Sequence, residues 1–220
     1  MAFWQPFAGW MNFNRLDGST TALSGCYTVA YRITDEPDDW SRRLNMFKYK
    51  DPDAIRRAKQ LVRHAVPPLL AKLSINRSDA LFIPALSSGE TTASRDGVLT
   101  LLAEACAGSV NSIWEMRALS KTAHFPLHKL YNAHARQTEL EKANYQAFSH
   151  RIGRKHVFVV DDLVTRGETL SRIAEAIQKV RPGGTVRGLV LGKTERKLWM
   201  QAISNDHVPQ SFDDAWKSNP

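Results

Sequence analysis

The chain has 220 residues and a formal net charge of +8, and 43% of its residues are hydrophobic while 24% are charged. This length suits one domain of moderate size with a small appended lobe, and the composition is ordinary for a globular protein. No apolar run approaches the ~18–20 residues that a membrane helix needs, and the start lacks the basic and apolar regions of a secretory signal. We therefore expect a cytoplasmic protein with no membrane span.

The first half of the chain is expected to hold one strand and one long helix. Residues 1–24 are rich in aromatic residues, Gly and Ser and should be irregular. Residues 26–33 are rich in β-branched and aromatic residues, which predicts a strand. Apolar residues recur at helical spacing over 51–74, which predicts a helix. Pro67 and Pro68 should bend or break this helix, because proline lacks the backbone N–H.

The second half alternates between apolar runs and helical patterns. We expect strands over 80–84, 112–119, 156–160 and 186–192, helices over 98–107, 136–150 and 168–180, and a loop over 120–135. Strands that alternate with helices predict an α/β domain with a mainly parallel central sheet flanked by helices. Such sheets bind ligands at the carboxyl ends of their strands. We expect an amino-terminal lobe or hood over 1–75, a core over 76–200 and a tail over 201–220.

The two cysteines, Cys26 and Cys106, form no CxxC pair. This spacing favours a reducing compartment and argues against both a disulfide framework and a zinc site. The sequence also lacks a Ser/His/Asp or Cys/His constellation that would indicate nucleophilic catalysis.

The segment VFVVDDLVTRGETL, residues 157–170, combines two features of a binding site. Asp161 and Asp162 follow the apolar run directly, so they should lie at the carboxyl edge of the sheet. The following loop opens a helix, and its free N–H groups, two hydroxyls and the helix dipole suit a phosphate. Gly167 permits backbone angles or close approaches that a side chain would prevent. Neither GxxxxGK[ST] nor GxGxxG is present.

Two carboxylates would repel a bare phosphate, so they should face another part of the ligand. The vicinal hydroxyls of a ribose are hydrogen-bond donors, and carboxylates are strong acceptors. We therefore expect Asp161 and Asp162 to hold a ribose diol. The 5-phosphate is expected to bind the loop residues Thr165, Arg166, Gly167, Glu168 and Thr169.

A purely structural interpretation of the same loop is a capping box. Thr165 and Glu168 have the T-x-x-E spacing in which each side chain caps the other residue's backbone N–H. This alternative accounts for these two residues without a ligand. It does not account for two adjacent acids at the end of a buried strand, nor for a glycine so early in the helix.

The stretch VVDDLVTRGETL resembles the phosphoribosyl pyrophosphate (PRPP) signature of type I phosphoribosyltransferases, which is an apolar strand, two acids and a Thr-x-Gly-x-Thr loop. The wider context is most similar to the competence protein F (ComF) branch of that family. That similarity is carried by the segments MFKYKDPDAIRRAKQLV, LFIPAL and RQTELEKANYQAF and covers roughly residues 25–195. The chain lacks the cysteine cluster for zinc and the Arg-Gly-Phe-Asn-Gln segment of ComF relatives.

The resemblance implies a reaction and a cofactor. In the family, PRPP loses pyrophosphate from C1 through an oxocarbenium-like transition state while a nitrogen nucleophile attacks, and Mg²⁺ offsets the charge of the leaving group. By resemblance, Asp161 and Asp162 hold the ribose hydroxyls and orient the Mg²⁺, directly or through water. The pyrophosphate loop is expected at Ser87, Ser88 and Gly89, where an ordinary Ser-Gly turn is the alternative.

The resemblance also implies a mobile catalytic lid over residues 120–136. Its ionisable residues are Lys121, His124, His128, Lys129, His134 and Arg136, and each of them has a solvated surface role as the alternative. Lys193 and Glu195 follow the last strand, where a base-reading hood could contribute.

Three functions remain open from the sequence. The first is an enzyme that makes or breaks the N-glycosidic bond of a nucleotide with PRPP or pyrophosphate. The second is a non-catalytic PRPP-fold module that binds a nucleotide or nucleic acid, as in DNA uptake. The third is an effector: proteins resembling this branch occur beside retron reverse transcriptases in antiviral defence, where the module would be a toxin.

The positive charge suggests a second partner. Eight basic residues crowd into 22 positions: Arg42, Arg43, Lys48, Lys50, Arg56, Arg57, Lys59 and Arg63. One small ligand cannot contact all of them, so we expect a polyanionic partner, either nucleic acid or a nucleoprotein such as a reverse transcriptase complex. A solvated face is the alternative, and the oligomeric state stays open.

Overall fold

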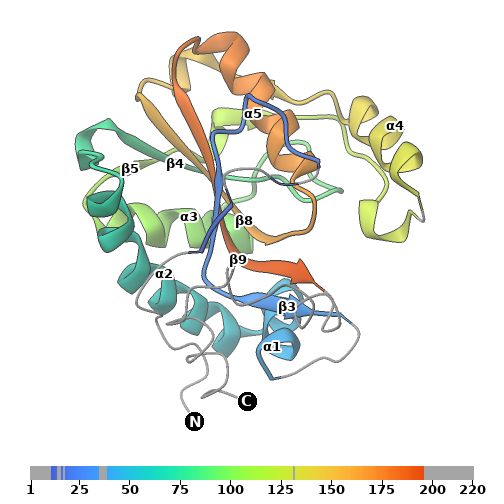
Figure 1. The fold of residues 1–220 in the computed structure, drawn as a ribbon, viewed down its shortest axis with the longest axis horizontal. Coiled ribbons are helices and arrows are strands. Elements are labelled where there is room, and N and C mark those ends of the chain that lie inside the picture. Colours follow the sequence, from blue (N-terminus) through green and yellow to red (C-terminus); the bar gives the residue numbers. More distant parts are fainter. Residues whose placement is uncertain (1–10, 14–15, 17, 35–38, 131, 196–220) are drawn as a thin grey trace.

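The structure is a computed structural model that describes residues 11–13, 16, 18–34, 39–130 and 132–195. It is an α/β fold in which a mainly parallel sheet lies between two layers of helices (Figure 1). The fold class predicted from the alternation of strands and helices is therefore confirmed.

The central sheet has seven strands in the described part of the chain. Their order from one edge is β1 (Met11–Phe13), β2 (Cys26–Thr28), β9 (Thr185–Glu195), β8 (His156–Val164), β4 (Ala80–Pro84) and β5 (Ile113–Trp114). β3 (Tyr31–Ile33) also pairs with β9, beyond the end of β2. β1 and β2 are antiparallel, whereas every other pair in this sheet is parallel. The strands β2 and β3 thus connect the predicted amino-terminal lobe to the core sheet.

The register places the end of β4 beside the acids of β8. Pro84, the last residue of β4, lies opposite Val160, the residue before Asp161. The Ala85 N–H also donates to the Val160 carbonyl at 2.8 Å, which holds the start of the following loop against β8. Because the carboxyl ends of parallel strands meet at one edge, the two segments that the sequence singled out are neighbours.

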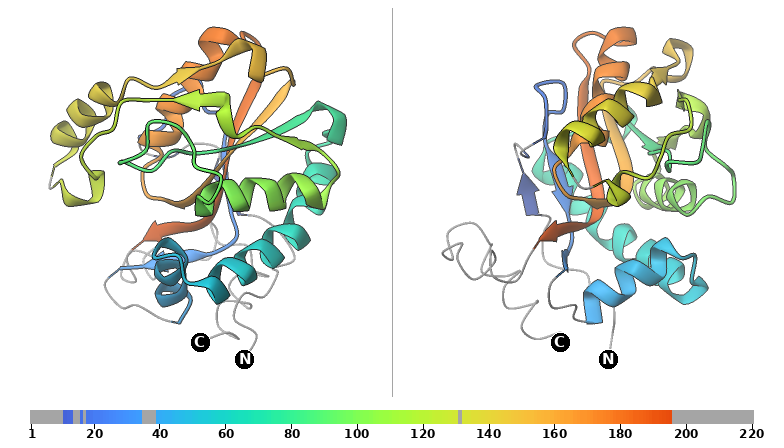
Figure 2. Two further views of the ribbon diagram at one scale, coloured as in Figure 1. Left: turned by 180° about the vertical axis from the view of Figure 1, so that it is seen from behind. Right: turned by 90° about the vertical axis from the view of Figure 1, so that its right-hand side faces the viewer.

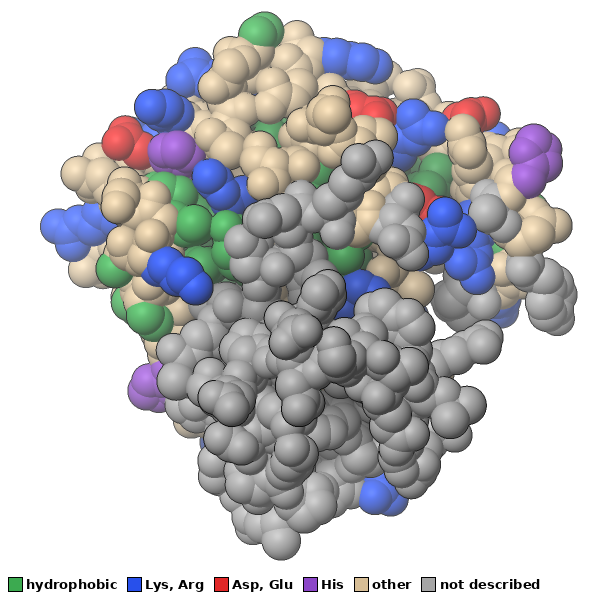
Figure 3. All heavy atoms as spheres, in the orientation of Figure 1, with side chains coloured by type: hydrophobic (Ala, Val, Ile, Leu, Met, Phe, Trp, Pro, Cys, Tyr) green, Lys and Arg blue, Asp and Glu red, His purple; other side chains and the backbone are tan. Residues whose placement is uncertain are grey.

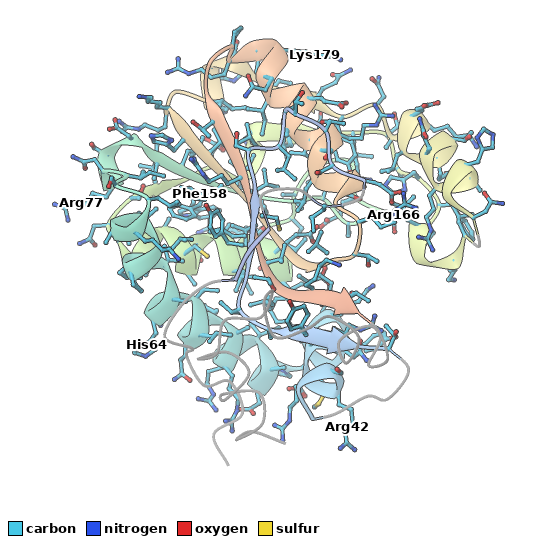
Figure 4. The ribbon with its side chains drawn as sticks, viewed as in Figure 1. Arg42, His64, Arg77, Phe158, Arg166 and Lys179 are labelled. Carbon is cyan, nitrogen blue, oxygen red and sulfur yellow. The ribbon has the colours of Figure 1, made fainter. Side chains whose placement is uncertain are left out.

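Helices cover both faces of the sheet (Figure 2). One face packs against α1 (Asp39–Lys48), α2 (Pro52–Lys72) and α3 (Val98–Ser109), and the other against α5 (Glu168–Val180), beside which α4 (Ala133–Ala143) lies. Successive residues of β8 alternate between the two cores: Phe158 packs among α2 and α3, whereas Val157 and Val159 face α5. Phe158 stacks on Phe82 of β4 with ring centroids 5.2 Å apart, at the centre of the sheet (Figure 4). Full burial of such a ring contributes about 1.5–3 kcal/mol, so this pair holds the strands that carry the site.

Short elements complete the fold. They are the 3₁₀ turns Arg77–Asp79, Met116–Ala118, Leu127–Lys129 and Ser149–Arg151, and the small antiparallel pair β6 (Leu119–Ser120) and β7 (Gln146–Ala147).

Several predicted elements are confirmed closely. The helix expected over 168–180 is α5 with the same bounds, and the strand expected over 80–84 is β4. The helix expected over 98–107 begins at Val98 and ends two residues later than predicted, at Ser109. These segments have strong apolar patterns and clear flanking loops, which is why sequence periodicity sufficed.

Four predicted elements differ from the structure. The strand expected over 26–33 is interrupted at Val29 and Ala30, where the Thr28 hydroxyl donates to the Ala30 carbonyl. The strand expected over 112–119 is divided by a 3₁₀ turn, so that only Ile113–Trp114 joins the central sheet and Leu119 begins β6. The helix expected over 136–150 spans 133–143 instead, since Asn144 adopts a left-handed conformation that ends it. Within the irregular start expected over 1–24, residues 11–13 form a strand.

The two prolines of α2 do not break it. The helix runs from Pro52 to Lys72 with Pro67 and Pro68 inside it, so the predicted break is absent. Val66, Leu69 and Leu70 flank the prolines and are buried in the core. We attribute the unbroken helix to this packing, which offsets the missing backbone N–H groups.

The two cysteines lie in the core of the protein. Cys26 and Cys106 are both free and buried, and burial raises the pKa of each thiol. Among the described residues, no helix combines the length and apolar character that crossing a membrane requires.

Candidate functional site

A cavity of about 930 Å³ opens at the carboxyl edge of the sheet. Its walls include the end of β8 with the loop into α5, the loop after β4, the start of α3, the end of β3, the α1–α2 connection, the end of β9 and the segment around 124–145. Asp161, Asp162 and every residue from Thr165 to Thr169 line it. The cavity therefore brings together the two halves of the site that the sequence predicted.

The two acids lie inside β8 rather than after it, because the strand continues to Val164. Both side chains are half-buried. The Asp162 N–H donates to Asp161 Oδ1 at 2.8 Å, and the Leu163 N–H donates to Asp162 Oδ1 at 2.7 Å. In each carboxylate, one oxygen thus accepts a hydrogen bond from the backbone N–H of the next residue. Apart from a side-chain interaction between the two carboxyl groups, the remaining oxygens have no hydrogen-bond donor among the described residues, so they can accept from a ligand.

Burial raises the pKa of Asp161 well above its ordinary value of 3.8, and the neighbouring Asp162 charge raises it further. The positive charge of Lys48 acts in the opposite direction with a smaller effect. An ionised pair of acids in this place is therefore under electrostatic strain. Hydroxyl donors or a cation on the ligand would relieve that strain.

The helix α5 begins with a left-handed glycine rather than a side-chain cap. Gly167 is the N-cap residue with φ +82°, and no side chain caps the first turn. The capping box between Thr165 and Glu168 is therefore wrong. The N–H groups of Gly167, Glu168, Thr169 and Leu170 donate to no acceptor within the described part of the chain. Free N–H groups at the positive end of a helix form an anion site, which fits the predicted phosphate.

Gly167 is required for a reason that the sequence did not reveal. A Cβ atom at this position would lie 2.8 Å from Leu16 Cδ1, and the φ of +82° already disfavours any other residue. The Gly18 N–H donates to the Arg166 carbonyl at 2.7 Å, and the Thr20 N–H donates to Ser171 Oγ at 3.0 Å. A Cβ would thus point at Leu16. A side chain at 167 would therefore meet Leu16 first, and this contact accounts for the glycine without a ligand.

Arg166 and Glu168 form a loose pair at the edge of the loop. Arg166 Nε lies 3.6 Å from Glu168 Oε1, which is too far for a hydrogen bond. This Nε is buried and has no hydrogen-bond partner within the described residues. Arg166 lies beside the first turn of α5 (Figure 4), so its guanidinium can turn to an anion at the same helix end.

Within the loop after β4, the side chain of Glu90 is hydrogen-bonded to Ser87. Ser87 and Ser88 line the cavity, as predicted, and so does Glu90. The Glu90 carboxylate accepts from the Ser87 N–H at 2.7 Å and from its hydroxyl at 2.8 Å. Gly89 does not line the cavity, and its backbone leaves open space where a Cβ would be. The Ser-Gly turn is thus present. The N–H and the hydroxyl of Ser87 already donate to Glu90 and are not free for a ligand.

The residues of the predicted lid divide into two groups. His124 and Arg136 line the cavity, whereas Lys129 and His134 are exposed and do not. The His128 side chain lies outside the described residues. Burial lowers the pKa of His124, and its Nδ1 lies 2.9 Å from the Phe125 carbonyl.

Lys121 is buried at 5% exposure and holds the loop after β4. Its Nζ donates to the Ser88 carbonyl at 2.9 Å, and its backbone N–H donates to the Thr91 carbonyl at the same distance. Burial lowers the pKa of Lys121 to about 8, with the nearby Glu90 charge opposing the shift. The surface role considered for this lysine is therefore wrong.

Three basic residues from the amino-terminal part also line the cavity: Arg32, Lys48 and Lys50. The sequence assigned the two lysines to a surface cluster, because their position over the carboxyl edge depends on how α1 packs against the sheet. Lys193 is buried but does not line the cavity, and the Glu195 side chain lies outside the described residues.

Tyr145 is a cavity residue that sequence reasoning missed. Its side chain is 9% exposed, and its hydroxyl is buried without a hydrogen-bond partner among the described residues. Burial and the Asp161 charge both raise the pKa of this hydroxyl, so it is a neutral donor at neutral pH. A buried donor without an acceptor costs free energy, which a ligand oxygen would recover. Helical periodicity could not predict that Tyr145 lies in the cavity, because Tyr145 follows Asn144, whose left-handed conformation ends α4.

The side chains of the cavity provide only some of the ligands that a Mg²⁺ ion needs. The described residues contain no group of three or more His, Cys, Asp or Glu side chains that could hold a metal ion. Asp161 and Asp162 offer hard oxygen ligands, and Mg²⁺ is usually bound by one or two carboxylates together with water and ligand phosphates. The pair therefore fits a Mg²⁺ ion that arrives with its ligand.

Comparison with known proteins gave no match to a family model and no match to a curated protein.

Proposed function

We propose that the protein binds the ribose 5-phosphate part of PRPP or of a nucleotide and makes or breaks the N-glycosidic bond of that nucleotide. The observation that carries the proposal is a single cavity lined both by adjacent carboxylates and by a helix N-terminus with free N–H groups. A diol and a phosphate on one small ligand match these two groups. The resemblance of residues 157–170 to the PRPP signature supports the same ligand.

The residues of the cavity have separate tasks in this proposal. Asp161 and Asp162 accept hydrogen bonds from the ribose hydroxyls and so fix the sugar ring. The 5-phosphate accepts from the N–H groups and hydroxyls of the loop that contains Thr165 and Thr169. Tyr145 donates to a ligand oxygen.

The proposed reaction exchanges a base for pyrophosphate at C1 of the ribose. In the direction of breakage, the bond from C1 to the base nitrogen breaks and a bond from C1 to a pyrophosphate oxygen forms. Mg²⁺, held by Asp161 and Asp162 together with the ligand, would offset the negative charge on pyrophosphate. The protein itself orients the ribose and limits the access of water to C1.

An activity assay tests the catalytic part. The protein is incubated with each nucleoside monophosphate, pyrophosphate and Mg²⁺, and chromatography measures free base and PRPP. We expect both products from at least one nucleotide, and neither from the Asp161→Asn, Asp162→Asn double variant. Absence of product with every nucleotide, or equal product from the double variant, would contradict the catalytic proposal.

A polyanionic partner is a second proposal, and the outer side of α2 supports it. Arg63 is exposed there and Lys59 is half-buried, while His64 points outwards from α2 (Figure 4). Other members of the predicted cluster are already engaged, since Arg56 and Arg57 pair with Asp53. Lys and Arg side chains are scattered over the described part of the face in Figure 3. The proposed contact is therefore a shallow electrostatic one along α2, with nucleic acid as the partner.

A further inference from the structure

The Glu90 carboxylate accepts hydrogen bonds from donors that a second phosphate group of the ligand would otherwise use. The loop after β4 begins beside Val160, one residue before Asp161, and Ser87 and Ser88 face the same cavity. We take the C1 substituent of a ribose on Asp161 and Asp162 to face this loop, because the loop is the cavity wall next to the two acids. The donors of Ser87, however, are both directed at the Glu90 carboxylate, at 2.7 and 2.8 Å.

Other groups of the same loop, next to Glu90, could also bind an anion. The N–H groups of Ser88 and Gly89 donate to no acceptor within the described residues. The buried ammonium of Lys121 lies on the Ser88 carbonyl at 2.9 Å, and Glu90 is the acid whose charge acts on it. The Glu90 carboxylate, which accepts from the N–H and the hydroxyl of Ser87 near a lysine, thus lies where an anionic ligand oxygen could accept the same hydrogen bonds. Glu90 therefore serves as an internal anion in this loop.

We propose that Glu90 determines ligand preference, so that the cavity favours ribose 5-phosphate and nucleoside monophosphates over ligands with a C1 diphosphate. The inference rests on the proposed function, because it takes the ribose 5-phosphate to lie on Asp161, Asp162 and the start of α5. A diphosphate must either displace the Glu90 carboxylate from Ser87 or lie beside it as a like charge. Ribose 5-phosphate avoids both costs because it carries no charge at C1.

The experiment compares two ligands in matched variants. Calorimetry with constant Mg²⁺ measures the dissociation constants of ribose 5-phosphate and PRPP for the wild type, Glu90→Ala and Glu90→Gln. Glu90→Gln keeps an acceptor for Ser87 and so preserves the turn while it removes the charge. Glu104→Ala is the control, because Glu104 is exposed on α3 and does not line the cavity.

We expect the wild type to bind ribose 5-phosphate more tightly than PRPP. Glu90→Ala should tighten PRPP binding about tenfold, the order expected for removal of one like charge near a partly exposed anion, and Glu90→Gln should give a smaller gain in the same direction. The affinity for ribose 5-phosphate should change less than twofold in both variants, and Glu104→Ala should change neither ligand.

Two results would overturn the inference while the proposed function stands. One is PRPP binding that is unchanged or weakened in both Glu90 variants while ribose 5-phosphate still binds. The other is a wild type that prefers PRPP. Failure of the wild type to bind either ligand would instead overturn the proposed function, and this inference with it.

Discussion

At the scale of single residues, the proposed binding groups are unfavourable for the ligand-free fold. The folded-state pKa of Asp161 lies above its ordinary value of 3.8. The native state thus binds this proton more tightly than the unfolded chain. The stability that the group contributes is fully present below pH 3.8 and is lost as the pH rises through the raised pKa. At neutral pH its ionised form is destabilising.

Removal of the Asp161 charge should weaken ligand binding without lowering the stability of the ligand-free protein. Asp161→Asn keeps an acceptor for the Asp162 N–H, so the ligand-free melting temperature at pH 7 should be equal to or higher than that of the wild type. With Asp162→Asn added, ribose 5-phosphate affinity should fall by about 3–6 kcal/mol, because two hydrogen bonds to charged groups are lost. Calorimetry and thermal unfolding measure the two effects, with exposed Asp96→Asn as the control. A large drop in the melting temperature without ligand would show that the acids serve the fold.

Tyr145→Phe tests the buried hydroxyl in the same manner. The hydroxyl has no partner in the described structure, so its removal should raise the ligand-free stability by about 1 kcal/mol. Ligand affinity should fall by up to about tenfold, the value of one neutral hydrogen bond. Exposed Tyr49→Phe should change neither property. A loss of stability together with unchanged affinity would exclude a role for Tyr145 in binding.

At the scale of elements, the loop into α5 depends on a segment distant in sequence. Gly167 has φ +82° and packs against Leu16. Gly167→Val should therefore destabilise the protein by about 2–5 kcal/mol, from left-handed strain together with overpacking. Leu16→Ala should relieve the overpacking part in a double-mutant cycle measured by denaturant unfolding. Equal destabilisation in both backgrounds would contradict contact between the two residues.

The sequence predicted those parts of the site that lie next to one another in the chain. Asp161, Asp162 and the loop from Thr165 to Thr169 belong to one segment, so their common edge followed from strand and helix order. Glu90 and Tyr145 could not be predicted in the same way. Their roles depend on where loops from β4 and after α4 meet across the sheet, and on which hydrogen bonds are left unmade. Neither property has a periodic signal in the sequence.

At the scale of the whole molecule, the net charge of +8 exceeds what the cavity needs. If the outer side of α2 neutralises ~4 phosphates of a single strand, log K should fall with log salt concentration at a slope near −3. Fluorescence anisotropy of labelled single-stranded DNA and RNA measures this slope. Lys59→Ala with Arg63→Ala should reduce it by about 1.4. No binding at low salt, or binding independent of salt, would identify the basic residues as an ordinary solvated surface.

The central claim is that one cavity binds a ribose and its 5-phosphate together. Calorimetric titration of the wild type with ribose 5-phosphate, ribose and inorganic phosphate tests it most directly. The account predicts that ribose 5-phosphate binds much more tightly than either fragment, because the acids and the helix end act on one ligand. It also predicts that the Asp161→Asn, Asp162→Asn variant binds ribose 5-phosphate no better than inorganic phosphate. Binding of ribose 5-phosphate that is no tighter than that of inorganic phosphate in the wild type would contradict the claim.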